Sequence, residues 1–182
     1  MNILIINGSH RKNGNTQKFS EYFQNLAIEN NINAEIINLV DKDINFCDGC
    51  LCCEETGECH LLDNFTEIAE TIKKTDVLVF ATPCYFNMPT ARFKNFIDRT
   101  NVLCDFLNNN KKYFCTFIVG QTEIESCLEA YRCIETYTQI MAMEAIFEEP
   151  IIAIARNEND LEIDNNIVEQ LQTIIKIVKE KM

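Results

Sequence analysis

Cysteines are concentrated in one short stretch of this chain, between residues 41 and 62, where Gly and acidic residues are also frequent. Four of them follow the spacing Cys-x2-Cys-x2-Cys with a further Cys downstream, which is compact enough to surround one [4Fe–4S] cluster. Structural zinc sites more often combine two separated Cys-x2-Cys pairs. The spacing therefore predicts four cluster ligands, Cys47, Cys50, Cys53 and Cys59. Zinc, or free and redox-active thiols, are the alternative interpretations of this stretch.

The fifth cysteine of the stretch, Cys52, lies between two predicted ligands and is expected to point away from a cluster. Gly49 and Gly57 supply the backbone freedom that a tightly folded ligand loop needs. Neighbouring carboxylates would add negative charge beside an anionic centre and lower its reduction potential. These acidic neighbours are Asp48, Glu54, Glu55 and Glu58.

A second chemistry-bearing segment runs from Gly8 to Thr16 and follows an apolar run at the N-terminus. Small, polar and Gly residues between a strand and a helix present backbone N–H groups at the positive end of the helix, which is an anion site. The Ser9 and Thr16 hydroxyls add donors, and Arg11 adds local positive charge. An ordinary strand-to-helix turn is the alternative interpretation.

Several known phosphate-binding motifs require residues that this segment lacks, which limits the kind of phosphate group it could bind. A triphosphate-binding loop needs four residues between its glycines and then Lys-Ser/Thr, but here five residues intervene and Asn15 follows Gly14. The dinucleotide pattern G-x-G-x-x-G is absent, because residue 10 is His10. A phosphatase-like loop would require a nucleophilic Cys that this segment lacks. A terminal monophosphate, as in FMN, fits best.

The elements that must position these segments alternate along the chain. Apolar runs predict strands at 3–6, 34–40, 76–81 and 113–119 and within 145–155. Helical spacing predicts helices from 16 to about 27, at 65–72, from about Pro89, at 123–143 and at 163–178. Strands separated by helix-length segments form parallel sheets with helices on both faces. We therefore expect one α/β domain over 1–182, doubly wound and flavodoxin-like, with a five-stranded sheet in the order 2-1-3-4-5 and a Cys-rich insertion at about 41–62. Ligands of such folds lie at the carboxyl ends of strands one, three and four.

Charge and hydropathy indicate which classes of partner the chain is unsuited to bind. The chain has 182 residues and a formal charge of −12, from 28 acidic and 16 basic side chains. So acidic a surface repels phosphate backbones, which argues against nucleic acid as a partner. The first residues contain neither a signal peptide nor a membrane span, so we expect a cytoplasmic protein with no membrane partner.

The motifs together resemble the NADPH-dependent FMN reductase family and its iron–sulfur flavoprotein branch. The resemblance rests on Gly8-Ser9, on Gly14-Asn15-Thr16, on the Cys-rich loop and on the segment from Thr82 to Arg99, in order and spacing. It covers Met1 to about Arg99, and the second half matches mainly in predicted topology. This chain departs from the family pattern at Cys84, Asn64 and Thr90, where an aliphatic residue, an acid and a Ser are usual.

The resemblance implies a set of FMN-binding residues. The phosphate would be held by Ser9, Arg11, Asn15 and Thr16. The flavin ring and ribityl chain would be lined by Pro83, Cys84, Tyr85, Phe86, Asn87 and Met88, with Gly120 and Gln121 nearby. Plain core packing is the alternative for Tyr85 and Phe86.

Three functions are compatible with these residues. The first is an FMN-dependent NAD(P)H oxidoreductase that passes electrons from NAD(P)H, its co-substrate, through FMN to a small-molecule or protein acceptor. The second is an iron–sulfur flavoprotein that carries electrons between FMN, a [4Fe–4S] cluster and ferredoxin-like partners. The third is a non-redox, flavodoxin-like binding module. The resemblance also implies a homodimer or homotetramer. No side chain is assigned a catalytic role, because the chemistry would take place on the flavin.

The remaining residues receive structural interpretations. Cysteines outside the loop are expected to be small buried hydrophobes: Cys104, Cys115, Cys127 and Cys133. Lys94, Asp98 and Arg99 are interpreted as helix-surface or helix–helix contacts and are assigned no chemistry.

Overall fold

The computed structural model describes residues 1–158 and 160–181. Its sheet is parallel throughout and has the order β2-β1-β3-β4-β5, with β6 also paired to β4. The strands are β1 (Asn2–Asn7), β2 (Asn33–Asn38), β3 (Val77–Pro83), β4 (Tyr113–Gly120), β5 (Glu144–Ala145) and β6 (Ile151–Ile154). The predicted flavodoxin-like fold class and strand order are confirmed.

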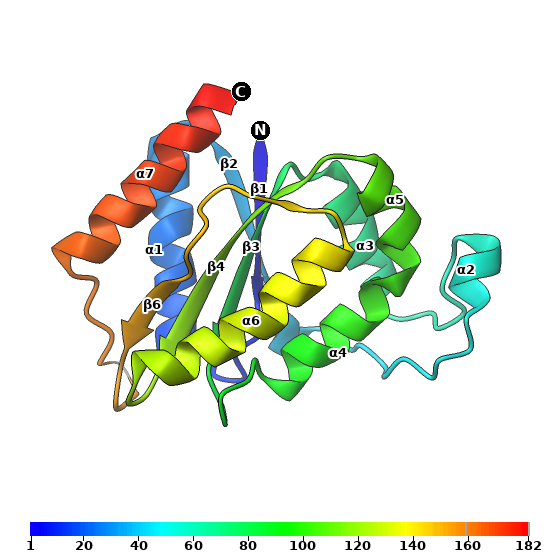
Figure 1. Cartoon of the computed structure of the whole chain (residues 1–182), viewed down its shortest axis with the longest axis horizontal. Coiled ribbons are helices and arrows are strands. Elements are labelled where there is room, and N and C mark those ends of the chain that lie inside the picture. Colours follow the sequence, from blue (N-terminus) through cyan, green and yellow to red (C-terminus); the bar gives the residue numbers. More distant parts are fainter. Residues whose placement is uncertain (159, 182) are drawn as a thin grey trace.

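Helices cover both faces of the sheet (Figure 1). One face carries α1 (Asn15–Glu29) and α7 (Asn165–Lys181). The other carries α3 (Phe65–Lys74), α4 (Ala91–Arg99), α5 (Cys104–Asn109) and α6 (Ile124–Ile140). Two short 3-10 helices, η1 (Leu39–Asp41) and η2 (Thr100–Leu103), lie in the connections.

Alternating strand residues divide the core into two layers, as the period of a β-strand requires. In β1, Ile3 and Ile5 pack with α1 and α7, whereas Leu4 and Ile6 pack with α3 and α4. Phe117 of β4 anchors the first layer, since its ring stacks on Phe19 at 4.8 Å between centroids. Both faces of the strands are therefore buried, which explains their nearly continuous apolar sequences.

The predicted fifth strand is split in two. β5 pairs with Tyr113 and Phe114 at the start of β4, and β6 pairs with Phe117–Gly120 at its end. The two pieces share one edge of the sheet, so the predicted topology holds. The split lets the chain after β6 reach the carboxyl edge beside Gly120, where Ala155 N–H donates to the Gly120 carbonyl.

The Cys-rich insertion contains one short helix, α2 (Cys52–Thr56), where sequence patterns predicted only a loop. Leu51 before it and Gly57 after it both have positive φ, which sets α2 off as a single turn. Figure 1 shows α2 projecting from the side of the molecule, away from the sheet. In the described part of the chain, no helix combines the length and apolar character that crossing a membrane requires.

Candidate functional site

A cavity of about 320 Å³ opens at the carboxyl edge of the sheet. It unites residues from the loop after β1, the end of β3, the end of β4 and the segment after β6. Its lining comprises Ser9, Arg11, Gly14, Asn15, Thr16, Pro83, Cys84, Tyr85, Val119, Gly120, Gln121, Ala155, Arg156, Asn157 and Glu158. Of the twelve residues named for FMN from the resemblance, nine lie in this lining, at the strand ends where ligands of such folds bind.

The first loop is held together by hydrogen bonds to the Ser9 hydroxyl and the Arg11 carbonyl. Arg11 N–H donates to Ser9 Oγ at 3.1 Å, and Ser9 Oγ donates to the Arg11 carbonyl at 3.3 Å. Gly14 N–H closes the loop by donating to the Arg11 carbonyl at 3.2 Å. Gly14 is the extended residue that precedes α1, and among the residues described no side chain caps this helix. Its first N–H groups therefore face the cavity edge as donors suited to an anion.

A close approach between the first loop and α4 requires Gly8. A Cβ at this position would lie 2.9 Å from two atoms of Phe93. Thr90 Oγ1 donates to the Gly8 carbonyl at 2.7 Å and accepts from Phe93 N–H at 3.2 Å, so it caps α4 and ties it to the loop. The Thr that replaces the usual Ser thus makes both contacts with its hydroxyl.

The segment after β6 is a part of the cavity that sequence patterns did not identify. Asn15 Nδ2 donates to the Asn157 carbonyl at 2.8 Å, and Asn15 Oδ1 accepts from Leu161 N–H at 3.3 Å. The Asn15 side-chain amide thus fastens this segment to the first loop. Arg156 adds a second guanidinium to the lining beside that of Arg11. Two cations at one cavity are notable on so acidic a chain.

The predicted ring-binding segment after β3 forms a tight hairpin. Tyr85 and Met88 exchange both backbone hydrogen bonds, at 2.9 and 3.1 Å. The residues between them, Phe86 and Asn87, have φ values of 50° and 62°, as a type I′ turn requires. Phe86 is 100% exposed. Phe86, Asn87 and Met88 therefore lie at the rim and not in the cavity lining, and the core-packing interpretation of Phe86 is wrong.

Cys84 lies in the lining and packs against the buried Cys127 of α6. Its thiol donates to the Ser126 carbonyl at 3.2 Å. Burial raises the pKa of the Cys84 thiol, and burial with the neighbouring Cys84 raises that of Cys127 to about 12. Both thiols are therefore protonated at neutral pH, and neither is a ready nucleophile.

A second, smaller cavity of about 40 Å³ lies under the Cys-rich loop. It is lined by Cys47, Asp48, Gly49, Cys50, Leu51, Cys53, Cys59, His60, Leu61, Asp98, Arg99, Asn101 and Val102. The four predicted cluster ligands all lie in this lining, and Cys52 does not.

The spacing of the sulfurs bears on which metal group fits. Sulfurs around one tetrahedral zinc lie within 4 Å or so of one another, because each Zn–S bond is about 2.3 Å. Among the described residues, the grouping found within 4.8 Å is Asp48, Cys50 and His60, with no trio of cysteines. In the part of the chain that the structure describes, the four cysteines therefore share this cavity without forming a closed zinc site.

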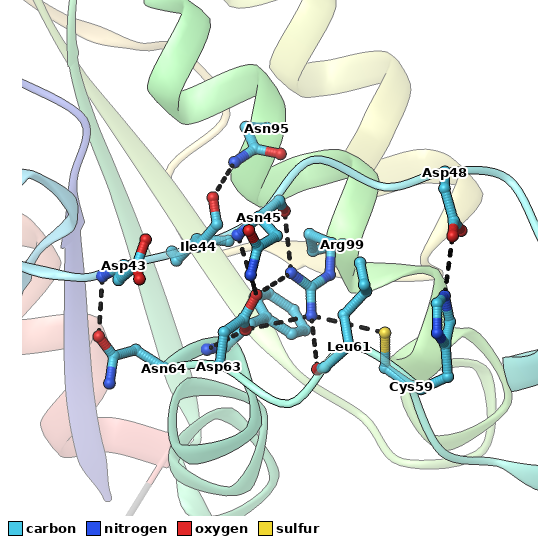
Figure 2. Close-up of polar contacts among 12 residues, drawn as sticks. Asp43, Ile44, Asn45, Asp48, Cys59, Leu61, Asp63, Asn64, Asn95 and Arg99 are labelled. Atoms are coloured by element: carbon cyan, nitrogen blue, oxygen red, sulfur yellow. Dashed lines mark hydrogen bonds and ion pairs between the residues drawn. The ribbon is translucent and has the colours of Figure 1, made fainter.

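Arg99 organises this second cavity (Figure 2). Its guanidinium forms a bidentate pair with Asp63, at 2.6 and 3.2 Å, and donates to the carbonyls of Asn45 and Leu61. Its remaining hydrogen bond is to Cys59 Sγ, at 3.4 Å. The interpretation of Arg99 as a helix-surface or helix–helix contact is wrong, since it is 2% exposed and its hydrogen bonds join both ends of the Cys-rich loop.

Electrostatics hold this pair in its charged form. Burial alone would raise the pKa of Asp63, but hydrogen bonds from Arg99, Asn45 and Phe65 and the guanidinium charge lower it to about 2. Burial opposes the charge of Arg99, but Asp63 outweighs it and raises the pKa of Arg99. The loop is therefore anchored by an ion pair that is charged throughout the neutral range.

The cysteines outside the loop divide into two groups. Cys115 and Cys127 are buried, as predicted. Cys104 is partly exposed and Cys133 is exposed, so their predicted burial is wrong. Both lie on helices, where one residue's shift around the axis turns a side chain from the core toward solvent.

The sequence matches a known protein family and several curated proteins. Residues 1–146 match the family described as NADPH-dependent FMN reductase. An iron-sulfur flavoprotein of Methanocaldococcus jannaschii is 36% identical over 103 residues, which cover 57% of this chain and 53% of that protein. An iron-sulfur flavoprotein of Clostridioides difficile is 38% identical over 111 residues, which cover 59% and 49%. The matched region thus spans about half the length of these relatives.

Solved structures share the fold at low sequence identity. A flavone reductase superposes with a TM-score of 0.75 at 18% identity, over 98% of this chain and 62% of that one. An NADH:FMN oxidoreductase superposes with a TM-score of 0.68 at 18% identity, over 100% and 89%. Since the family match covers most of the sequence, the chain belongs to the NADPH-dependent FMN reductase family.

Proposed function

We propose that this protein is an FMN-dependent NAD(P)H oxidoreductase, which passes electrons from a nicotinamide through bound FMN to an acceptor. One observation carries the proposal. The cavity at the carboxyl edge of the sheet combines the hydroxyls and helix-start N–H groups of the first loop with Pro83, Cys84 and Tyr85 and with two arginines. Its volume, about 320 Å³, lies in the range of sites that bury a small organic ligand.

The residues present fit FMN group by group. The N–H groups at the start of α1 and the hydroxyls of Ser9 and Thr16 would bind the phosphate. Arg11 would offset the negative charge of the chain there. The Pro83–Tyr85 backbone and Gly120 would face the ring, and Tyr85 would offer it a flat apolar surface. When bound, FMN supplies the capacity to accept a hydride and to release electrons.

The protein's own contribution would be binding, orientation and exclusion of water. The segments that follow β3 and β4 would orient the ring, and Phe86 at the hairpin tip would cover its open side. The neutral thiols of Cys84 and Cys127 would keep this wall apolar. No general acid or base is needed from the lining, because the flavin carries the hydride chemistry.

The test is anaerobic reduction of the FMN-loaded protein. We expect NADPH or NADH to bleach the flavin absorbance, and a quinone to restore it. If a one-electron donor such as dithionite bleaches the flavin but neither nicotinamide does, the protein is an electron carrier and not an NAD(P)H oxidoreductase. Failure to bind FMN at all would favour a non-redox binding module.

A second function is favoured by the cavity under the Cys-rich loop. We propose that Cys47, Cys50, Cys53 and Cys59 bind a [4Fe–4S] cluster, which would make the protein an iron–sulfur flavoprotein. Support comes from the cavity lining, which includes these four and omits Cys52, and from the names of the relatives. A bound cluster would supply one-electron transfer.

Anaerobic reconstitution with iron and sulfide tests the ligand set. We expect Cys53→Ala to lose both iron and acid-labile sulfide, and Cys52→Ala to retain both. Wild-type protein with a full complement of FMN and no iron would leave the cysteines as structural or redox thiols. We further predict a cytoplasmic homodimer or homotetramer with a small-molecule or protein electron acceptor.

A further inference from the structure

Two side chains outside the cysteine set point hydrogen-bond donors at the predicted cluster ligands. Arg99, at the end of α4, has its Nη2 3.4 Å from Cys59 Sγ. Asn101, in η2, has its Nδ2 3.3 Å from Cys53 Sγ. Sulfur is a weak acceptor when protonated and a strong one as a thiolate. These donors are therefore placed for sulfurs that carry negative charge.

The position of Arg99 does not depend on the cysteine. Asp63, the Asn45 carbonyl and the Leu61 carbonyl hold the guanidinium, and its carbon lies 5.0 Å from the centre of the Phe65 ring. The donor directed at Cys59 is therefore preorganised, and it costs little entropy when a ligand arrives.

A further donor of Arg99 is unused. The Nε–H is buried and has no hydrogen-bond partner among the described residues. Buried donors are nearly always paired, and an unpaired one costs about 1–3 kcal/mol. Arg99 also lines the cavity that the four cysteines share. The orphaned donor is consistent with an acceptor-rich group in that cavity.

The charges around the cavity determine whether the reduction potential of a bound cluster rises or falls. The described residues that line the cavity include Asp48, Asp98 and His60, and Arg99 is the one guanidinium or ammonium group among them. A cluster held by four thiolates is anionic, and one-electron reduction adds a further negative charge. Hydrogen bonds to the sulfurs and a nearby cation favour the reduced form and raise the reduction potential.

We propose that Arg99 and Asn101 donate hydrogen bonds to the thiolates of Cys59 and Cys53 and raise the reduction potential of the cluster bound there. The proposal rests on the second proposed function. It assigns to these two residues the opposite effect from that of the acidic side chains of the loop. They tune the cluster, and they are not among its ligands.

The experiment measures the midpoint potential of the reconstituted cluster by anaerobic titration with dithionite. Asn101 is exposed, so Asn101→Ala can be tested without loss of the fold. The matched control is Asn108→Ala, because Asn108 Nδ2 lies 3.4 Å from Cys104 Sγ, outside the cavity. Arg99→Lys keeps the positive charge opposite Asp63 but cannot reproduce the forked set of donors.

We expect Asn101→Ala to lower the midpoint potential of the cluster. Arg99→Lys should lower it further, to at least 59 mV below wild type, which corresponds to a tenfold change in a one-electron equilibrium. Asn108→Ala should match wild type. An unchanged potential in both cavity variants, with iron and sulfide retained, would assign Arg99 and Asn101 a purely structural role. Wild-type protein that never acquires iron would overturn both this proposal and the cluster, while FMN content and nicotinamide reduction of the same sample test the oxidoreductase function separately.

Discussion

Thr90 and Arg99 stand at opposite ends of the nine-residue helix α4, and each end is tied to a different cavity. Thr90 Oγ1 bonds the Gly8 carbonyl in the loop that borders the larger cavity. Arg99 reaches Cys59 and Asp63 in the smaller one. A helix of this length spans roughly 14 Å, at 1.5 Å per residue. Since α4 is packed on the sheet through Phe93 and Phe96, it holds the two candidate redox sites at a fixed spacing.

Asp63→Asn should strongly destabilise the protein. The Arg99–Asp63 pair has side-chain exposures of 1% and 4%, and removing one member of a buried pair costs about 3–5 kcal/mol. Urea denaturation at pH 7 measures this loss. The exposed Lys73–Glu70 pair supplies the control, since Glu70→Gln should leave the free energy of unfolding nearly unchanged. Equal effects of the two substitutions would mean that the buried pair does not anchor the loop.

The same pair predicts the response to acid. The pKa of Asp63 is lowered from an ordinary value of 3.8 to about 2 in the folded protein. Its contribution to stability is therefore complete above about pH 4, and it is lost as the pH falls from about 4 toward 2, because the unfolded chain takes up the proton first. Thermal melts over this range should show a steeper decline for wild type than for Asp63→Asn.

Phe86→Gly should stabilise the free protein and weaken FMN binding. Phe86 is fully exposed with a φ of 50°, a conformation that costs a non-Gly residue about 1–2 kcal/mol, and part of that cost returns with Gly. Ala142 is also exposed and has the same φ, so Ala142→Gly should give a similar gain. Loss of aromatic contact with the flavin should lower FMN affinity roughly 3- to 10-fold in Phe86→Gly alone. Indistinguishable FMN affinities in the two variants would show that Phe86 makes no such contact.

Gly120 should couple energetically to Cys127. A Cβ at Gly120 would lie 2.4 Å from Cys127 Sγ, so Gly120→Ala should cost about 1–3 kcal/mol through overpacking. In the double variant with Cys127→Ala the sulfur is gone, and the total loss should fall short of the sum of the single losses by about 1 kcal/mol. Denaturation midpoints of the four proteins measure the cycle. Strict additivity would place the sulfur out of contact with the new methyl group.

The fold was predictable because its strands are continuous apolar runs and its helices keep a regular apolar face. Ile3–Ile6 and Val77–Ala81 illustrate the strands, and each is buried on both faces. The first loop was predictable for a similar reason, since its Gly, Ser and Thr residues are adjacent in sequence and act through local backbone geometry.

The features that sequence patterns missed depend on contacts between distant segments. Arg99 reads as the polar end of an amphipathic helix, and only the return of the chain from Asn45 to Asp63 buries it. Arg156 and Asn157 reach the larger cavity because the strand before them is split. No local sequence pattern predicts this split. The positive φ of Phe86 was equally hidden, since this conformation usually selects Gly, Asn or Asp.

The central claim is that the larger cavity holds FMN by its phosphate, and a titration of flavin-free protein with FMN and with riboflavin tests it most directly. We expect FMN to bind at least roughly tenfold more tightly than riboflavin, since a hydrogen bond to a charged group contributes about 1.5–3 kcal/mol. In Ser9→Ala and Thr16→Val this preference should shrink, because both substitutions remove a hydroxyl that would bind the phosphate, which riboflavin lacks. Equal affinities for the two flavins in wild type, or a preference that survives both substitutions, would place the phosphate elsewhere and contradict the account.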